Sequence, residues 1–117
     1  MYRNALANNL RYSRAEGLDQ VMQEHRLDAI VGSTVRLPWL TDFINGDPSE
    51  PSDFTSAAAI AGYPHITVPA GQVHGLPVGL SFIAGAWAEP TLFKLAYAFE
   101  QATRLRRAPT FVKSVNL

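Results

Sequence analysis

The stretch SAAAIAGYPHITVPAGQVHGLPVGLSFIA, residues 56–84, decides the fold of this chain. It lies inside a longer window, residues 54–88, that contains no Asp, Glu, Lys or Arg. The surface of a soluble protein normally carries charge, because charged groups are costly to bury and are kept in contact with water. We therefore expect this window to be core.

Glycine and proline residues divide this stretch into a helix, a strand, a connection and a second strand. The Ala-rich run ends at Gly62, which suits the left-handed exit of a helix, and Pro64 keeps the following chain extended. Two runs typical of strands come next, residues 66–70 and 78–84. The connection between them predicts a hairpin with a long loop of about six residues.

Apolar spacing predicts the remaining elements. Residues 4–25 read as an amphipathic helix, and Gly17 inside that pattern predicts a bend or a break. Residues 27–32 form a short apolar run typical of a buried strand. The most regular helical stripe begins at Glu89-Pro90. We expect an α/β fold in which helices pack on a small mixed sheet, and a chain of 117 residues is long enough for a single domain.

A long connection, residues 33–52, separates the first strand from the Ala-rich helix. Connections of this length are unusual unless they carry function or are poorly ordered. The large aromatic residues Trp39 and Phe43 argue against simple disorder. Ser52 or Asp53 can cap the helix that follows, since a short side-chain oxygen accepts a hydrogen bond from a free N–H of the first turn.

Composition excludes several classes of function. The formal net charge is zero and there is no cysteine, which argues against nucleic-acid binding and removes disulfides, Cys-based zinc sites and a thiol nucleophile. No apolar run approaches the roughly 18 residues of a membrane span, and the first residues are polar where a signal peptide would be apolar. These features predict a soluble cytoplasmic protein with no membrane partner.

Motifs for common chemistries are missing. The three histidines, His25, His65 and His74, lack metal-ligand spacing, so we expect no metal site and no cofactor. There is no G-x-S-x-G elbow and no phosphate-binding loop. The basic residues after position 103 are typical of a solvated helix end. Pattern and spacing alone therefore give an α/β domain with no reaction in view.

The residues themselves resemble a family. Four segments look like the C-terminal part of the amidase signature enzymes: EGLDQVMQEHRLDAIVGST (16–34), AGYPHITVPAG (61–71), GLPVGLSFIAGAW (75–87) and EPTLFKLAYAFEQATRLRRAP (89–109). The resemblance covers about residues 2–110. It implies the C-terminal part of the amidase signature fold, present here as a single domain or a fragment of a larger one.

The resemblance also implies an activity. Members of this family hydrolyse amide bonds with a serine nucleophile, a second serine in a cis peptide and a lysine base, all from an earlier part of the polypeptide. In this chain no two serines are adjacent, and Lys94 and Lys113 are the only lysines. We therefore expect no catalytic residue here, and a chain that is inactive alone.

By the same resemblance, residues 33–55 lie near the pocket for a small amide substrate. Asp53 is then the candidate for substrate contact, with Trp39 and Phe43 as pocket walls; the alternatives are an N-cap for Asp53 and ordinary packing for the two aromatic residues. The expected partner is the missing N-terminal catalytic part, or a second copy of this chain. The competing reading is a non-catalytic, oligomerising interaction module.

Overall fold

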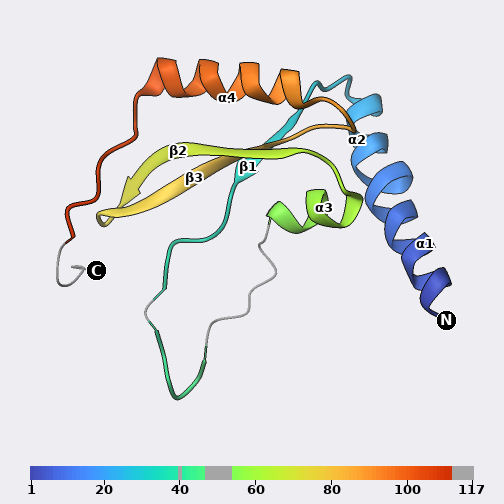
Figure 1. Ribbon diagram of the computed structural model, residues 1–117, viewed down its shortest axis with the longest axis horizontal. Helices are drawn as coiled ribbons and strands as arrows, with labels where there is room; N and C mark the ends of the chain where they lie inside the picture. The colour runs from blue at the N-terminus through green and yellow to red at the C-terminus, as the bar shows by residue number, and fades with distance from the viewer. Residues whose placement is uncertain (40, 47–53, 112–117) are drawn as a thin grey trace.

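The computed structural model describes residues 1–39, 41–46 and 54–111, and Figure 1 shows their arrangement. The elements, in chain order, are α1 (Tyr2–Ser13), the π-helical segment η1 (Arg14–Leu18), α2 (Asp19–Glu24), β1 (Ile30–Ser33), α3 (Phe54–Ala61), β2 (His65–Val73), β3 (Leu76–Ile83) and α4 (Glu89–Thr103). Every element predicted from the sequence is present, with bounds that shift by a few residues.

The three strands form one sheet in the order β1-β3-β2. Both pairings are antiparallel: Ile30 lies opposite Ile83 in the first, and His65 lies opposite Ile83 in the second. The predicted α/β class, with helices packed on a small sheet, is confirmed. The sheet was expected to be mixed, but every strand pair in the described part of the chain is antiparallel.

The β2–β3 connection is much tighter than predicted. Pairing continues to Val73 opposite Leu76, so that only His74 and Gly75 form the turn. Both have positive φ, 51° and 77°, which is the conformation of a type I′ hairpin turn. The prediction of a long loop was wrong because it stopped β2 at the Pro-Ala-Gly segment. A β-bulge between Pro69 and Gly71 accommodates that segment and lets the ladder resume.

The predicted break in the first helix is confirmed. Glu16 and Gly17 have non-helical backbone angles within η1, between α1 and α2. A Cβ atom on Gly17 would lie 2.3 Å from the carbonyl oxygen of Tyr12, which no side chain can tolerate. The glycine is therefore required by the close approach of the preceding turn to this bend.

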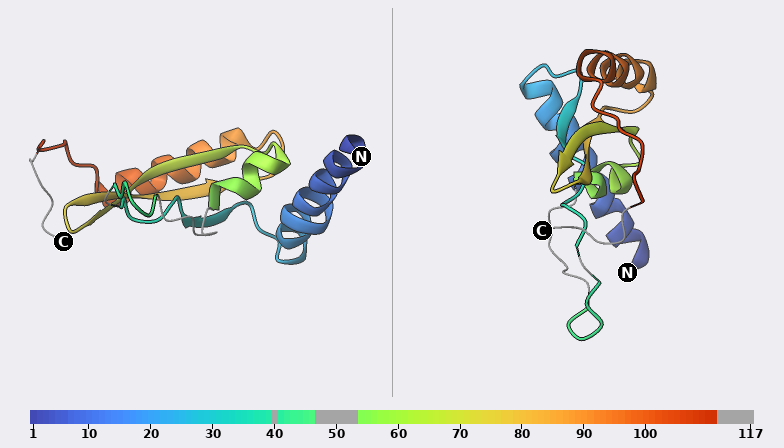
Figure 2. Two further views of the ribbon diagram at one scale, coloured as in Figure 1. Left: turned by 90° about the horizontal axis from the view of Figure 1, so that it is seen from below. Right: turned by 90° about the vertical axis from the view of Figure 1, so that its left-hand side faces the viewer.

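Helices cover both faces of the sheet (Figure 2). On one face, Val68 and Phe82 pack with Leu92 and Ala96 of α4, and the ring of Phe82 meets that of Phe99 edge to face at 6.3 Å. On the other face lies the short helix α3, which uses small side chains for its close approach and buries Ala58 and Ala61.

Gly32 of β1 allows α3 to come this close. A Cβ atom on Gly32 would lie 2.7 Å from the ring of Phe54, the first residue of α3. The Ala-rich composition of α3 and the glycine of β1 thus serve the same purpose, which is a short distance between helix and sheet.

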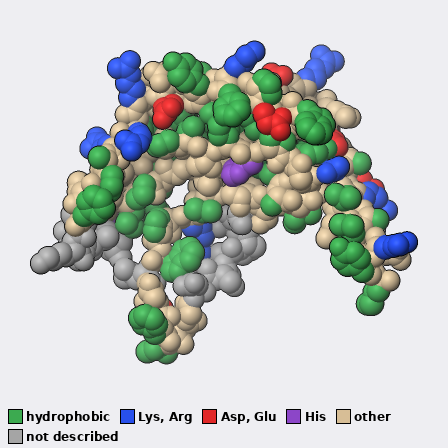
Figure 3. Space-filling model, viewed as in Figure 1, with side chains coloured by type: hydrophobic (Ala, Val, Ile, Leu, Met, Phe, Trp, Pro, Cys, Tyr) green, Lys and Arg blue, Asp and Glu red, His purple; other side chains and the backbone are tan. Residues whose placement is uncertain are grey.

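The charge-free window is only partly buried within this chain. Phe82, Ile83 and Ala84 are buried, but Ile60 is 52% exposed and Trp87 is 88% exposed. Figure 3 shows further hydrophobic side chains at the surface along α4, over α1 and on the loop below the sheet. No helix among the described residues is long and apolar enough to cross a membrane.

The molecule is flat and extended, with principal extents of 47 × 41 × 19 Å. Its radius of gyration is 17.0 Å, whereas a compact domain of this length has about 13 Å. It exposes 9076 Å², whereas a compact monomer of this mass exposes about 6,300 Å². The described fold therefore leaves uncovered a large surface that a compact domain would bury.

Replacing Gly17 by Ala should lower the free energy of unfolding by about 2 kcal/mol, because the new methyl group meets a backbone oxygen that cannot move aside. Urea unfolding followed by circular dichroism measures the change. Gly85→Ala is the matched control: its new methyl group would lie 3.7 Å from Met22, an ordinary contact. Equal effects of the two substitutions would contradict this account of the bend.

Candidate functional site

The loop after β1 carries the aromatic residues predicted to line a substrate pocket. Trp39 is 51% exposed and Phe43 is 96% exposed, on a loop that extends away from the sheet (Figure 1). Asp53, the candidate for substrate contact, lies outside the described residues. The structure thus places the two aromatic residues on one projecting loop, and their role as pocket walls stays a prediction.

A turn around Asp42 fixes the tip of this loop. One carboxylate oxygen accepts hydrogen bonds from the N–H groups of Ile44 (2.8 Å) and Asn45 (3.0 Å), and the other accepts one from the Asn45 side chain (2.7 Å). These bonds, that of the Asn45 side chain foremost, hold the pKa of Asp42 below its usual value. Sequence reasoning passed over the turn, although an Asp side chain often bonds the backbone two residues on and Asn45-Gly46 is a dipeptide that marks turns. The result is an ordered tip that presents Phe43 and Ile44 outward.

Three hydroxyl groups meet on the same face of the sheet as α3. Ser81 is fully buried; its Oγ lies 2.9 Å from the Thr67 hydroxyl and donates to the Thr34 hydroxyl at 2.8 Å. Gly79 makes room for them, because a Cβ there would lie 2.6 Å from Thr34 Oγ1. The hydrogen-bond partners of Ser81 are hydroxyl groups rather than a base, so this cluster has the character of a structural network and not of an activated nucleophile.

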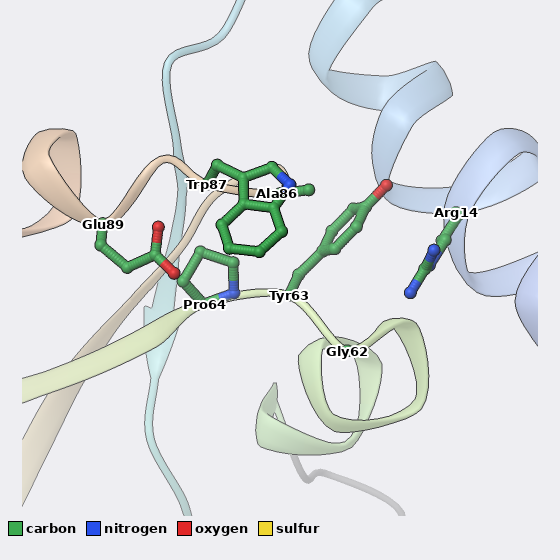
Figure 4. A pocket seen from close by; sticks show the side chains of 7 residues that line it. All are labelled: Arg14, Gly62, Tyr63, Pro64, Ala86, Trp87 and Glu89. Carbon is green, nitrogen blue, oxygen red and sulfur yellow. The ribbon is translucent and has the colours of Figure 1, made fainter.

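A pocket with a volume of about 400 Å³ opens where the first helices meet the sheet (Figure 4). Its wall is made by Arg14 of η1, by Gly62, Tyr63 and Pro64 between α3 and β2, and by Ala86, Trp87 and Glu89 before and at the start of α4. Arg14 and Glu89 lie at opposite sides, with the rings of Tyr63, Pro64 and Trp87 between them (Figure 4). The pocket therefore combines an apolar floor with one cationic and one anionic end.

Arg14 and Tyr63 also lock the helices to the sheet. The Nε–H of Arg14 donates to the carbonyl of Ala61 at 2.6 Å, at the C-terminal end of α3, where the helix dipole favours a cation. Its guanidinium lies 5.3 Å from the centre of the Tyr63 ring. The Tyr63 hydroxyl donates to the carboxylate of Asp19 at 2.7 Å. Burial, followed by this hydrogen bond, raises the pKa of Tyr63 above its usual value.

A second pocket of about 260 Å³ adjoins the first and shares Pro64 and Glu89 with it. Ile66, Leu92 and Phe93 make it more apolar, and His65 lines it from the start of β2. His65 Nε2 is buried and has no hydrogen-bond partner in the structure. Within the described ranges, no group of three or more His, Asp or Glu side chains could hold a metal ion.

Sequence reasoning missed these pockets. Arg14 reads as one charge on the outer face of an amphipathic helix, and Trp87 reads as the end of an apolar run. Residues 14, 63 and 87 come from three separate segments and line one pocket only in the folded chain. No local pattern signals that meeting, which depends on contacts between elements far apart in the sequence.

Comparison with known proteins identifies the class. The chain belongs to the amidase family, whose model matches residues 1–93. A probable amidase of Arabidopsis thaliana is 39% identical over 97 residues, which are 82% of this chain and 16% of the plant protein. One subunit of the glutamyl-tRNA(Gln) amidotransferase from Desulforudis audaxviator is 54% identical over 50 residues, 43% of this chain and 10% of that protein.

Solved structures agree with the family match. The native peptide amidase of Stenotrophomonas maltophilia has 46% sequence identity and a TM-score of 0.80, covering 94% of this chain and 22% of that one. A peptide amidase in complex with the competitive inhibitor chymostatin gives 45% identity and a TM-score of 0.87, again with 94% and 22% covered. This chain therefore spans about a fifth of the solved structures that it matches, and it is a portion of the amidase signature fold.

Replacing Tyr63 by Phe should lower the free energy of unfolding by about 1 kcal/mol at neutral pH, through loss of the hydrogen bond to Asp19. The raised pKa of Tyr63 adds a pH dependence. Its contribution is fully present below the unfolded tyrosine pKa of about 10 and is lost as the pH rises towards the higher folded value.

Denaturant titrations between pH 8 and pH 11.5 measure this dependence. The stability difference between wild type and Tyr63→Phe should shrink above pH 10 if the wild type alone loses this contribution. Tyr97→Phe, at a side chain 66% exposed on α4, is the control and should leave the curve unchanged. A stability difference that is constant across this range would contradict the assignment.

Proposed function

We propose that this chain is the C-terminal portion of an amidase that hydrolyses amide C–N bonds, and that it supplies structure and part of the substrate pocket but no catalytic group. The observation that carries the proposal is the fit of nearly the whole chain to about a fifth of a peptide amidase structure at 46% identity. Such a fit supports common descent of this portion, and the parent activity is the natural expectation for the complete protein.

The residues of this chain support the absence of a catalytic centre. A Ser-Lys mechanism requires a serine within hydrogen-bond reach of its base, together with donors where the oxyanion forms. Ser81 is bonded to threonine hydroxyls, and Lys94 lies exposed on α4. Neither residue meets the requirement, which supports a nucleophile and a base that come from another part of the amidase.

The loop around Asp42 supports a contribution to the substrate pocket. A hydrogen-bonded turn holds Phe43 almost fully exposed, so the ring contributes almost no burial energy within this chain. In a complete amidase the same ring can form the wall of a pocket for the apolar part of an amide substrate. On this proposal Trp39 and Asp53 belong to the same region.

A second candidate, an oligomerising module without catalysis, has one observation in its favour. The exposed area exceeds that of a compact monomer by an amount that normally finds a partner. On the proposed amidase role, the rest of the enzyme covers the same exposed area. That role also explains the family match, which an oligomerising module does not.

The isolated 117-residue chain should show no turnover of a peptide amide or a simple aliphatic amide above the buffer background. The second protein to be tested is a chimaera in which this chain replaces the matching segment of the Stenotrophomonas peptide amidase. The chimaera should hydrolyse the peptide amide. Turnover by the isolated chain that a serine-directed reagent blocks would overturn the proposal. An inactive chimaera that folds would equally count against it.

In that chimaera, Phe43→Ala should raise KM for the peptide amide about tenfold with little change in kcat, as expected when an apolar wall that binds substrate and transition state equally is removed. Ile44→Ala is the matched control, since Ile44 is the next residue of the same tip and is 93% exposed. Identical KM values for the two variants would show that Phe43 does not line the substrate pocket.

A further inference from the structure

The backbone at Trp87 is strained. Trp87 is the third residue of a turn closed by the Ala88 N–H, which donates to the Gly85 carbonyl at 3.2 Å. Its φ is 65°, in the left-handed region that glycine and asparagine tolerate and that bulky side chains seldom adopt. The start of α4 directly after Ala88 holds the turn in place. A strained conformation of this kind points to a role for the side chain that it positions.

This chain gives the side chain almost nothing in return. Trp87 is 88% exposed, although tryptophan has one of the largest apolar surfaces of any residue. Tryptophan is also one of the three residue types enriched among the side chains that dominate the binding energy of protein interfaces. A large aromatic group that is exposed and strained at once has the features of an anchor for something outside the chain.

The surroundings of Trp87 suit a polypeptide surface. The two adjoining pockets share Pro64 and Glu89, and we call them together the Trp87 groove, defined by Arg14, Tyr63, Pro64, Trp87, Glu89 and Leu92. In the first of these pockets, the rings of Tyr63, Pro64 and Trp87 lie between the guanidinium of Arg14 and the carboxylate of Glu89 (Figure 4). An apolar centre with a charged rim is the usual anatomy of a protein interface.

We infer that the Trp87 groove is the seat of the catalytic part of the amidase polypeptide, with Trp87 as the central anchor of that contact. The inference rests on the proposed function and names its partner. The solved amidases have nearly four-fifths of their length outside the portion that this chain covers. This chain exposes 9076 Å², whereas a compact monomer of the same mass exposes about 6,300 Å². The excess is larger than the area of about 800 Å² per partner that a standard interface buries.

Trp87→Gly tests the inference because its effect should differ between two proteins. In the isolated chain, glycine adopts the left-handed turn without strain and little packing is lost, so the midpoint of thermal unfolding should stay constant or rise. In the chimaera with the Stenotrophomonas peptide amidase, loss of the anchor should lower the midpoint by about 3 °C or more. Trp87→Asn, which also tolerates this backbone, should behave in the same way.

Tyr97→Ala is the matched control, an exposed aromatic residue on α4 that does not line either pocket, and it should change both midpoints equally. A Trp87→Gly effect of the same size in both proteins, or in neither, would overturn the inference. Sedimentation of the isolated chain tests whether a second copy of the chain occupies the groove instead. If the chain dimerises, Trp87→Gly weakens the dimer tenfold and the chimaera is unaffected, the groove belongs to a second copy and the inference is wrong. A folded but inactive chimaera defeats the proposed function, whereas an active chimaera insensitive to Trp87→Gly defeats only this inference.

Discussion

The structure depends on strand β3, the one described strand that is paired on both edges. Its backbone holds β1 on one side and β2 on the other, and its side chains serve both faces of the sheet. Phe82 packs toward α4, while Ser81 and Gly79 on the opposite face are small enough for the hydroxyl cluster and the approach of α3. Since the pleat alternates these residues strictly, a slip of one position would expose Phe82 and bury the wrong face. The side chains and pairing of one short strand therefore determine where the other two strands, α3 and α4 pack.

The same sheet explains why this chain reads as part of something larger. With β3 in the centre, both β1 and β2 present an outer edge, and open edges with apolar neighbours are features that complete proteins usually cover. The rest of this chain is too small to bury the whole of the uncharged window that contains β3. Membership of the amidase family is consistent with this, because the corresponding segment of a solved amidase is only about a fifth of that chain.

Much of the fold could be predicted from local chemistry. Gly62 gave the end of α3, Gly17 gave the break in the first helix, and Glu89-Pro90 gave the start of α4, because each depends on backbone rules that act within a few residues. The tight hairpin at His74-Gly75 was missed because proline and glycine suggested a loop, while a bulge kept the ladder intact. The Trp87 groove could not be predicted either, since Arg14 and Trp87 come together only through tertiary packing. The residues with a proposed substrate contact, Trp39, Phe43 and Asp53, came from resemblance alone and stay predictions.

The central claim is that the charge-free surface of this chain is interior in a complete amidase. Amide hydrogen exchange on the isolated chain and on the peptide amidase chimaera measures this most directly. We expect the amides of β3 to be protected in both proteins, and those along the outer edges of β1 and β2 to exchange rapidly in the isolated chain but slowly in the chimaera. Edge amides that exchange at the same rate in both proteins would contradict the account, because the surface left open here would then be a true outer surface.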